Sequence, residues 1–335
     1  MTGLKTPSFW YEDKSWQKNL LGPIALIYQA GRRLARAGAP APYQSPLPVL
    51  CLGNLTAGGS GKTPAAIALM KILQEKSLAG SPCFLTRGYG GTERGPVRVD
   101  PARHTAVHIG DEPLLLARHA PVIVARDRPA GARLAAKSGI DVIVMDDGFQ
   151  NPSLEKTLSL VVIDGDSGFG NQSLLPAGPL REPLSTGFAR ADGFILIGAD
   201  RAGVIRRLPP EKPIFRAQIV SGKIRVSPAT TEGEPLPYFA FTGLGRPEKL
   251  RKTLESQGIT LAAFQDFPDH HRYTARDLRK LQESAARYGA RLITTEKDVV
   301  KLPPEFATDV LPIRLDFDDE KAVTTFLKRK LTGLI

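Results

Sequence analysis

The sequence predicts an α/β protein in which a doubly wound, mostly parallel sheet is joined by a two-stranded hairpin to a smaller α/β domain. Short unbroken apolar runs alternate with helical patterns through the first two thirds of the chain, as in parallel sheets covered on both faces. A second alternation of the same kind begins near residue 238. With 335 residues, the chain is long enough to form two such cores.

The first sheet is predicted from six apolar runs. They cover residues 49–52, 83–86, 122–124, 142–145, 160–163 and 194–197. Polar residues that follow these strands are expected along one edge of the sheet, where such folds bind ligands.

The rest of the chain predicts the linker and the smaller domain. Residues 214–226 alternate in character around Gly222 and indicate a hairpin with a tight turn. Strands are expected at 238–241, 261–264, 291–294 and 311–315, with helices at 247–256 and 275–288. The predicted parts are an N-terminal helical segment (1–40), the sheet domain (41–210), the linker (211–232) and a smaller domain closing over the site (233–335).

A glycine-rich turn follows the first strand and precedes a helical pattern at 65–73. Such turns let backbone N–H groups converge on phosphate oxygens, and the helix N-terminus adds a positive dipole. In a P-loop frame, Lys62 reaches the β- and γ-phosphates and Thr63 ligates Mg²⁺. The first position holds Thr56 instead of the usual glycine. We predict a nucleoside triphosphate site made of Thr56, Ala57, Gly58, Gly59, Ser60, Gly61, Lys62 and Thr63.

Acidic residues follow two of the predicted elements. Asp146 and Asp147 end a strongly apolar strand, so one is expected to support a Mg²⁺–nucleotide complex while the other braces a loop. Asp111 precedes a short helical run, where helix capping is the alternative role.

Residues 267–273 contain two of the five histidines. No third histidine or cysteine accompanies them at zinc-like spacing, so a histidine acting with a carboxylate in proton transfer fits better than a metal site. Arg126 and Arg128 follow the third strand, and Arg181 lies in a proline-rich loop. Each arginine is a candidate phosphate contact or a surface residue.

The net charge of +11 favours anionic partners such as nucleic acid, a membrane surface or a phosphorylated substrate. No segment matches a nucleic-acid-binding module. Cys51 and Cys83 lie in apolar runs and are expected to be small buried thiols. We expect neither a signal peptide nor a segment able to span a bilayer.

The first forty residues combine aromatic and aliphatic side chains with a basic cluster. That combination is typical of a helix in contact with a membrane surface. The alternative is a helix packed on the core with Arg32, Arg33 and Arg36 in solvent. The sequence leaves both open.

Taken as an ordered set, seven segments resemble the tetraacyldisaccharide 4′-kinases, the lipid A 4′-kinases of Gram-negative bacteria. These segments are residues 53–64, 87–90, 110–112, 146–150, 175–182, 267–271 and 295–298. A threonine at the first P-loop position is normal in that family. Members often carry histidine after the Asp-Asp-Gly-x-Gln segment, whereas this chain has Asn151, so a role for that histidine does not transfer.

The resemblance implies ATP- and Mg²⁺-dependent phosphorylation of the 4′-hydroxyl of a tetraacylated glucosamine disaccharide 1-phosphate. It implies a peripheral enzyme at the cytoplasmic face of the inner membrane, with the lipid and an anionic membrane surface as partners, and neither nucleic acid nor an obligatory protein partner. The alternatives are a P-loop kinase or ATPase with a soluble anionic substrate, or a nucleotide-gated switch.

The resemblance also assigns roles to residues. Asp111 takes the proton from the sugar hydroxyl, His270 holds and tunes Asp111, and Lys62 serves catalysis at the phosphates. Thr63, Asp146 and Glu182 would lie at the metal. Weaker substrate or phosphate contacts are Asp147, Arg126, Arg128, Arg181, Gln150 and Tyr89.

Overall fold

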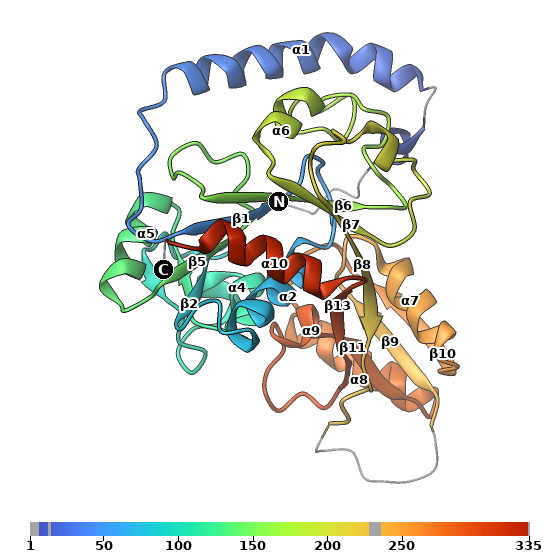
Figure 1. The fold of residues 1–335 in the computed structure, drawn as a ribbon. Helices are drawn as coiled ribbons and strands as arrows, with labels where there is room; N and C mark the ends of the chain where they lie inside the picture. Colours follow the sequence, from blue (N-terminus) through green and yellow to red (C-terminus); the bar gives the residue numbers. More distant parts are fainter. Residues whose placement is uncertain (1–6, 13–14, 228–235, 334–335) are drawn as a thin grey trace.

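A computed structural model describes residues 7–12, 15–227 and 236–333, and it confirms the predicted fold class: a large, mostly parallel sheet and a second parallel sheet (Figure 1). The large sheet has the order β13-β8-β7-β6-β1-β5-β2-β4-β3. Only β3 and β13, at the two edges, run antiparallel to their neighbours. Its strands are β1 (Val49–Gly53), β2 (Pro82–Thr86), β3 (Val97–Arg98), β4 (Val122–Val124), β5 (Val142–Asp146), β6 (Leu158–Asp164), β7 (Gly193–Ile197), β8 (Ile214–Ser221) and β13 (Ile313–Phe317).

Helices cover both faces of this sheet, which is why its central strands are apolar without alternation. One face packs against α2 (Lys62–Glu75), α4 (Asp111–Leu116) and α10 (Glu320–Leu331). The other face packs against α5 (Arg128–Lys137) and the segment around α6 (Leu184–Arg190). The short helices α3 (Ala106–Ile109) and η2 (Ile205–Arg207) complete this part. Cys51 and Cys83 are buried free thiols within it, as predicted.

The smaller sheet has the order β10-β9-β11-β12 and is parallel throughout. Its elements are β9 (Tyr238–Thr242), α7 (Pro247–Ser256), β10 (Leu261–Asp266), α8 (Ala275–Arg287), β11 (Arg291–Thr295), α9 (Glu296–Val299) and β12 (Asp309–Leu311). Leu250 and Leu254 of α7 pack on one face and Leu281 of α8 on the other. The strands at its core match those expected from the sequence.

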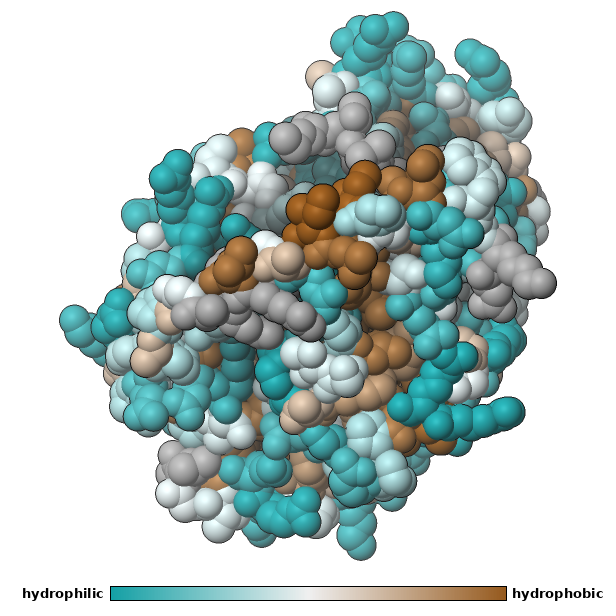
Figure 2. Space-filling view, turned by 90° about the horizontal axis from the view of Figure 1, so that it is seen from above, coloured by the Kyte–Doolittle hydropathy of each residue, from teal (hydrophilic) through white to brown (hydrophobic). Residues whose placement is uncertain are grey.

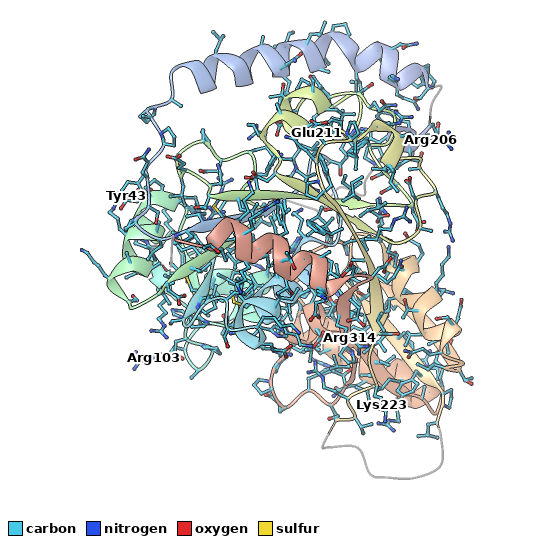
Figure 3. All side chains as sticks on the ribbon, in the orientation of Figure 1. Tyr43, Arg103, Arg206, Glu211, Lys223 and Arg314 are labelled. Carbon is cyan, nitrogen blue, oxygen red and sulfur yellow. The ribbon has the colours of Figure 1, made fainter. Side chains whose placement is uncertain are left out.

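The predicted local hairpin at 214–226 is wrong. Residues 214–221 form the single strand β8, whose antiparallel partner is β13, from Ile313↔Ser221 to Phe317↔Ala217. Pro312 separates β12 from β13, because proline cannot donate to a strand ladder. The expected strand at 311–315 is therefore split between two sheets. The chain passes between the two sheets twice, once after β8 and once before β13. Lys223 follows β8 and Arg314 lies on β13 (Figure 3).

The C-terminal segment also differs from the prediction, which placed all of 233–335 in the smaller domain. After β13 the chain continues into α10, which packs on the large sheet, with the ring of Phe326 5.2 Å from that of Phe215 on β8. The smaller sheet is thus inserted between β8 and β13, and the chain returns to the larger core (Figure 1).

The N-terminal segment forms η1 (Ser8–Tyr11) and the long helix α1 (Trp16–Ala37), which lies along the outside of the larger domain (Figure 1). Large apolar side chains of α1 are exposed, with Ile27 72% and Leu34 74% accessible, while Ala25 is buried. Apolar side chains gather on the face that α1 presents (Figure 2). No helix in the described part of the chain is both long and apolar enough to cross a bilayer.

Candidate active site

The glycine-rich turn connects buried β1 to the N-terminus of α2, as a phosphate-binding loop requires. Gly61 precedes the helix with a φ of 82°, a conformation that side chains other than glycine rarely adopt. A Cβ at this position would lie 2.6 Å from Cδ1 of Ile197. Ser60 Oγ is buried and finds no hydrogen-bond partner among the described residues, so the loop keeps an unsatisfied polar atom.

The first half of the turn is braced by the proline-rich loop. The N–H of Ala57 donates to Pro179 O at 2.7 Å, and the N–H of Arg181 donates to Leu55 O at 2.8 Å. Between these bonds Thr56 pairs with Leu180 in an antiparallel bridge. A β-branched residue suits such an extended pairing, which explains physically why threonine can replace glycine at the first position.

The two acids after β5 face different partners. Thr63 Oγ1 donates to Asp146 Oδ2 at 3.3 Å. Asp147, with a left-handed φ of 51°, lies 3.7 Å from Lys62 Nζ and accepts from Arg181 Nη1 at 3.2 Å. Burial alone would raise the pKa of Asp147, but the charges of Lys62 and Arg181 outweigh burial and lower it.

Asp146 has the opposite electrostatic character. Burial raises its pKa to about 7, and the nearby charge of Glu112 adds to this against the opposing charge of Lys62. Its Oδ1 is buried and lacks a hydrogen-bond partner within the described residues. A buried carboxylate oxygen of this kind suits a cation.

Glu182 is buried, and each of its two carboxylate oxygens accepts a hydrogen bond. Gln150 Nε2 donates to its Oε1 at 3.1 Å, and Arg190 Nη2 donates to its Oε2. Gln150 Nε2 also donates to Asn54 O at 2.8 Å, so the amide ties Glu182 to the residue after β1.

A hard cation fits this donor set. Within residues 7–12, 15–227 and 236–333, no group of three His, Cys, Asp or Glu side chains is placed to hold a metal unaided. Mg²⁺ usually keeps several waters and binds through one or two protein oxygens plus substrate phosphates. The Thr63 hydroxyl and the unpartnered Oδ1 of Asp146 are donors of that type.

Asp111 and His270 meet across the two domains. His270 Nδ1 lies 2.9 Å from Asp111 Oδ2 and 3.0 Å from its Oδ1. Asp111 begins α4 after Gly110, where a Cβ would come within 2.3 Å of Tyr89 O. His270 has a left-handed φ of 57°, which is strained for histidine. The pair predicted from two distant segments is therefore brought into direct contact.

The environment of Asp111 favours its ionised form. Burial, which leaves 5% of the residue exposed, raises its pKa, but the His270 hydrogen bond and the charge of Lys297 outweigh burial and hold the pKa at about 2. Glu112 adjoins this pair and also acts on Asp146, so the Asp111–His270 pair and the P-loop acids share one electrostatic environment.

The weaker candidates are distributed around this centre. Arg126 Nη2 donates to Gly91 O at 3.2 Å. Arg128 is buried and donates to Ala125 O at 2.6 Å; burial and the nearby charge of Arg87 lower its pKa to about 10. Tyr89 is exposed, and its ring makes a T-shaped contact with that of His270, with 5.5 Å between the ring centroids. Asn151 Oδ1 accepts from Ser153 N and Oγ and so shapes a turn.

Sequence reasoning missed three residues that the fold places at the site. Asn54 Nδ2 donates to Thr56 O at 2.6 Å and shapes the P-loop from inside. Arg190 binds Glu182 and the carbonyl of Phe149. Lys297 lies 3.3 Å from His270 Nε2. Asn54 and Lys297 lie within the segments 53–64 and 295–298 of the family resemblance. The sequence therefore drew attention to these segments, but it did not show what the two side chains contact.

A family model described as "Tetraacyldisaccharide-1-P 4'-kinase" matches residues 17–332. A tetraacyldisaccharide 4'-kinase of Rhodospirillum centenum is 46% identical over 336 residues, covering 98% of each chain. One of Gluconacetobacter diazotrophicus is 49% identical over 314 residues, covering 92% of this chain and 91% of the relative.

Among solved structures, LpxK from Aquifex aeolicus in complex with ATP superposes with a TM-score of 0.75 at 27% identity. The match covers 93% of this chain and 99% of that one.

Proposed function

The chain belongs to the tetraacyldisaccharide 4'-kinase family, and from that premise we propose how its residues divide the work of the reaction. The protein is a lipid A tetraacyldisaccharide 4'-kinase, which transfers a phosphoryl group from ATP to a hydroxyl. The acceptor in this proposal is the 4′-hydroxyl of a tetraacylated glucosamine disaccharide 1-phosphate.

Asp111 is the general base. Its low pKa keeps it ionised at neutral pH, and burial leaves its oxygens to His270, the Glu112 N–H and an incoming hydroxyl. As the sugar O–H bond breaks, the proton passes to Asp111 and the oxygen bonds to the γ-phosphorus. The bond from that phosphorus to the bridging oxygen breaks, and ADP leaves.

The P-loop holds the donor. Residues 56–63 surround the phosphates, and Lys62 neutralises charge that develops on the γ-phosphoryl group. Asp147 and Arg181 hold Lys62 and the loop in place through the ion pairs described above. A Mg²⁺ ion would neutralise further phosphate charge; Thr63 and Asp146 would hold it, with Glu182 supporting them.

One observation carries this proposal: the contact between Asp111 and His270, which joins the two domains beside the P-loop acids. A triphosphate-binding loop alone is compatible with a switch or an ATPase. A buried, ionised carboxylate oriented by a histidine is the additional part that a kinase needs.

The test is a transfer assay with γ-labelled ATP that offers the disaccharide 1-phosphate lipid beside a water-soluble glucosamine phosphate. We expect label in the lipid alone. Equal labelling of the soluble sugar would favour the alternative of a soluble anionic substrate, and ADP release without labelled acceptor would favour an ATPase.

The exposed face of α1 supports peripheral binding to an anionic membrane surface. Its apolar side chains, including Leu20, Ile24 and Ile27, have no core to cover them, and the chain is strongly basic. We expect the protein to sediment with anionic vesicles at low salt. A variant with Leu20→Ser, Ile24→Ser and Ile27→Ser should remain in the supernatant while folding normally. Wild-type protein that stays in the supernatant would contradict membrane binding.

A further inference from the structure

Lys297 places its ammonium group against the pair that joins the two domains. It comes from α9 of the smaller domain, and its Nζ lies 3.3 Å from His270 Nε2. Carboxylates surround the same nitrogen, with Asp269 Oδ1 at 3.5 Å and Glu112 Oε1 at 3.9 Å. Only 20% of the side chain is exposed. In the proposed mechanism this lysine contacts neither the nucleotide nor the sugar.

The surroundings keep Lys297 charged. Burial would lower its pKa, but the charges of Glu112, Asp111 and Asp269 outweigh burial and raise it. The side chain is therefore an ammonium at neutral pH. An ammonium has three donor hydrogens and no acceptor.

This charge state decides which ring nitrogen of His270 carries the proton. A donor 3.3 Å from Nε2 requires that nitrogen to accept, so the neutral ring holds its hydrogen on Nδ1. Nδ1 in turn lies 2.9 Å from Asp111 Oδ2 and donates to it. With the opposite tautomer, Nε2–H would face an ammonium and a lone pair would face a carboxylate.

We propose that Lys297 is a positioning residue for phosphoryl transfer: its hydrogen bond to Nε2 holds His270 in the tautomer that donates from Nδ1 to Asp111. This rests on the proposed role of Asp111 as the base. One consequence concerns the proton taken from the hydroxyl. Because Nδ1 already carries a hydrogen, that proton stays on Asp111 during the transfer and is not relayed through the ring.

The local structure supports Lys297 in this position through its neighbour Asp298. The buried Asp298 accepts from Thr242 Oγ1 and Thr295 Oγ1, each at 2.7 Å, and from the N–H of Gly243 at 3.0 Å. Gly243 O accepts from the N–H of His270 at 3.2 Å. The segments that carry the lysine and the histidine are thus fixed to the same buried carboxylate.

The tautomer can be observed directly in the full-length protein. Long-range ¹H–¹⁵N correlation spectra of ¹⁵N-histidine-labelled protein, recorded at about pH 8.5 so that free imidazole is neutral, distinguish a proton on Nδ1 from one on Nε2. The His270→Gln variant identifies the signals of His270 among the five histidines. We expect the proton on Nδ1. A proton on Nε2 in the wild-type protein overturns the proposal without any lysine variant.

Two variants separate the hydrogen bond from the charge, and a third is their control. Lys297→Met should lower kcat about 10- to 100-fold and leave the KM for ATP unchanged. It should also raise the population of the Nε2–H tautomer of His270 above that in the wild-type protein, because only Asp111 then favours Nδ1–H. Lys297→Gln keeps an N–H donor and should retain the Nδ1–H tautomer and recover part of the rate. Lys280→Met, which removes an exposed lysine from α8, is the matched control and should behave as wild type.

A single tautomer and an unchanged kcat in Lys297→Met would also overturn the proposal. If that variant does not fold, the wild-type and Lys297→Gln spectra still decide it. Failure of the kinase assignment is distinguishable, because it would appear as absent lipid labelling with the Nδ1–H tautomer intact.

Discussion

The two halves of the active site are built in contrasting ways. The P-loop half lies directly beside the large sheet, where buried β1 leads into Thr56–Thr63 and β5 leads into Asp146–Asp147. The His270 half arrives on a loop of the smaller domain, with a strained backbone at His270 and a buried polar network beneath it. In the proposed mechanism the first half holds the phosphates, and the second positions the base Asp111. Nucleotide binding and proton transfer should therefore be separable by mutation.

The largest expected effect is a loss of proton transfer, with ATP binding retained, when the base Asp111 is replaced. Asp111→Asn removes the proton acceptor and should lower kcat by about 10²- to 10⁴-fold. ATP affinity, measured by calorimetric titration, should stay within about twofold because no P-loop contact is altered. Glu283→Gln, an exposed change on α8, serves as the control. A kcat within tenfold of wild type would remove Asp111 from the mechanism.

Lys62→Met tests the other half. Loss of this cation should lower kcat by about 10²- to 10³-fold, as for other groups that stabilise developing charge. In contrast to Asp111→Asn, it should also weaken ATP binding measurably. Lys71→Met, an exposed lysine on the same helix, should leave both quantities unchanged. Unaltered ATP affinity in Lys62→Met would contradict a phosphate contact.

Asp298→Asn tests the buried polar network of the smaller domain, which includes Thr242, Gly243 and Thr295. The carboxylate is fully buried and pairs with Lys301 Nζ at 2.7 Å, so removing its charge leaves a buried cation uncompensated. We expect a loss of about 3 kcal/mol in the free energy of unfolding. Urea unfolding monitored by hydrogen exchange should show the smaller domain opening first, with ATP binding retained. A loss below about 1 kcal/mol would indicate that this network does not hold the domain.

The smallest expected effect concerns pH. The folded pKa of Asp111, about 2, lies below its ordinary value of 3.8, so its ionised form stabilises the folded chain above that value. This contribution is lost as the pH falls from about 4 to about 2, and it amounts to about 2 kcal/mol. Urea unfolding between pH 5 and 3 should show a shallower pH dependence for Asp111→Asn than for wild type. Parallel curves would contradict the low pKa.

The same contrast explains what could be predicted from the sequence. The P-loop half depends on local patterns, a strand, a glycine-rich turn and a helix, and residues 49–75 contain all three. The contact of Asp111 with His270 spans 159 positions and entered only through family resemblance. Lys297 lay inside a noticed motif, but the direction of its side chain depends on how α9 docks against α4.

The topology of the linker was missed for a related reason. The alternating character of residues 214–226 indicates an extended chain, but it does not indicate which strand pairs with it. The true partner, β13, begins just after Pro312, nearly a hundred residues later. A proline between two apolar runs marks the break, yet only the folded chain shows that the second run returns to the large sheet.

The double crossing of β8 and β13 has a mechanical consequence. A smaller domain attached by a single strand could swivel about that strand as well as bend. Two crossings bonded side by side, with the N–H of Gly222 donating to Pro312 O at 2.9 Å where they leave the sheet, resist twisting. We therefore expect this pair of strands to bend more readily than it twists, so that His270 would approach and leave Asp111 mainly through bending of the linker.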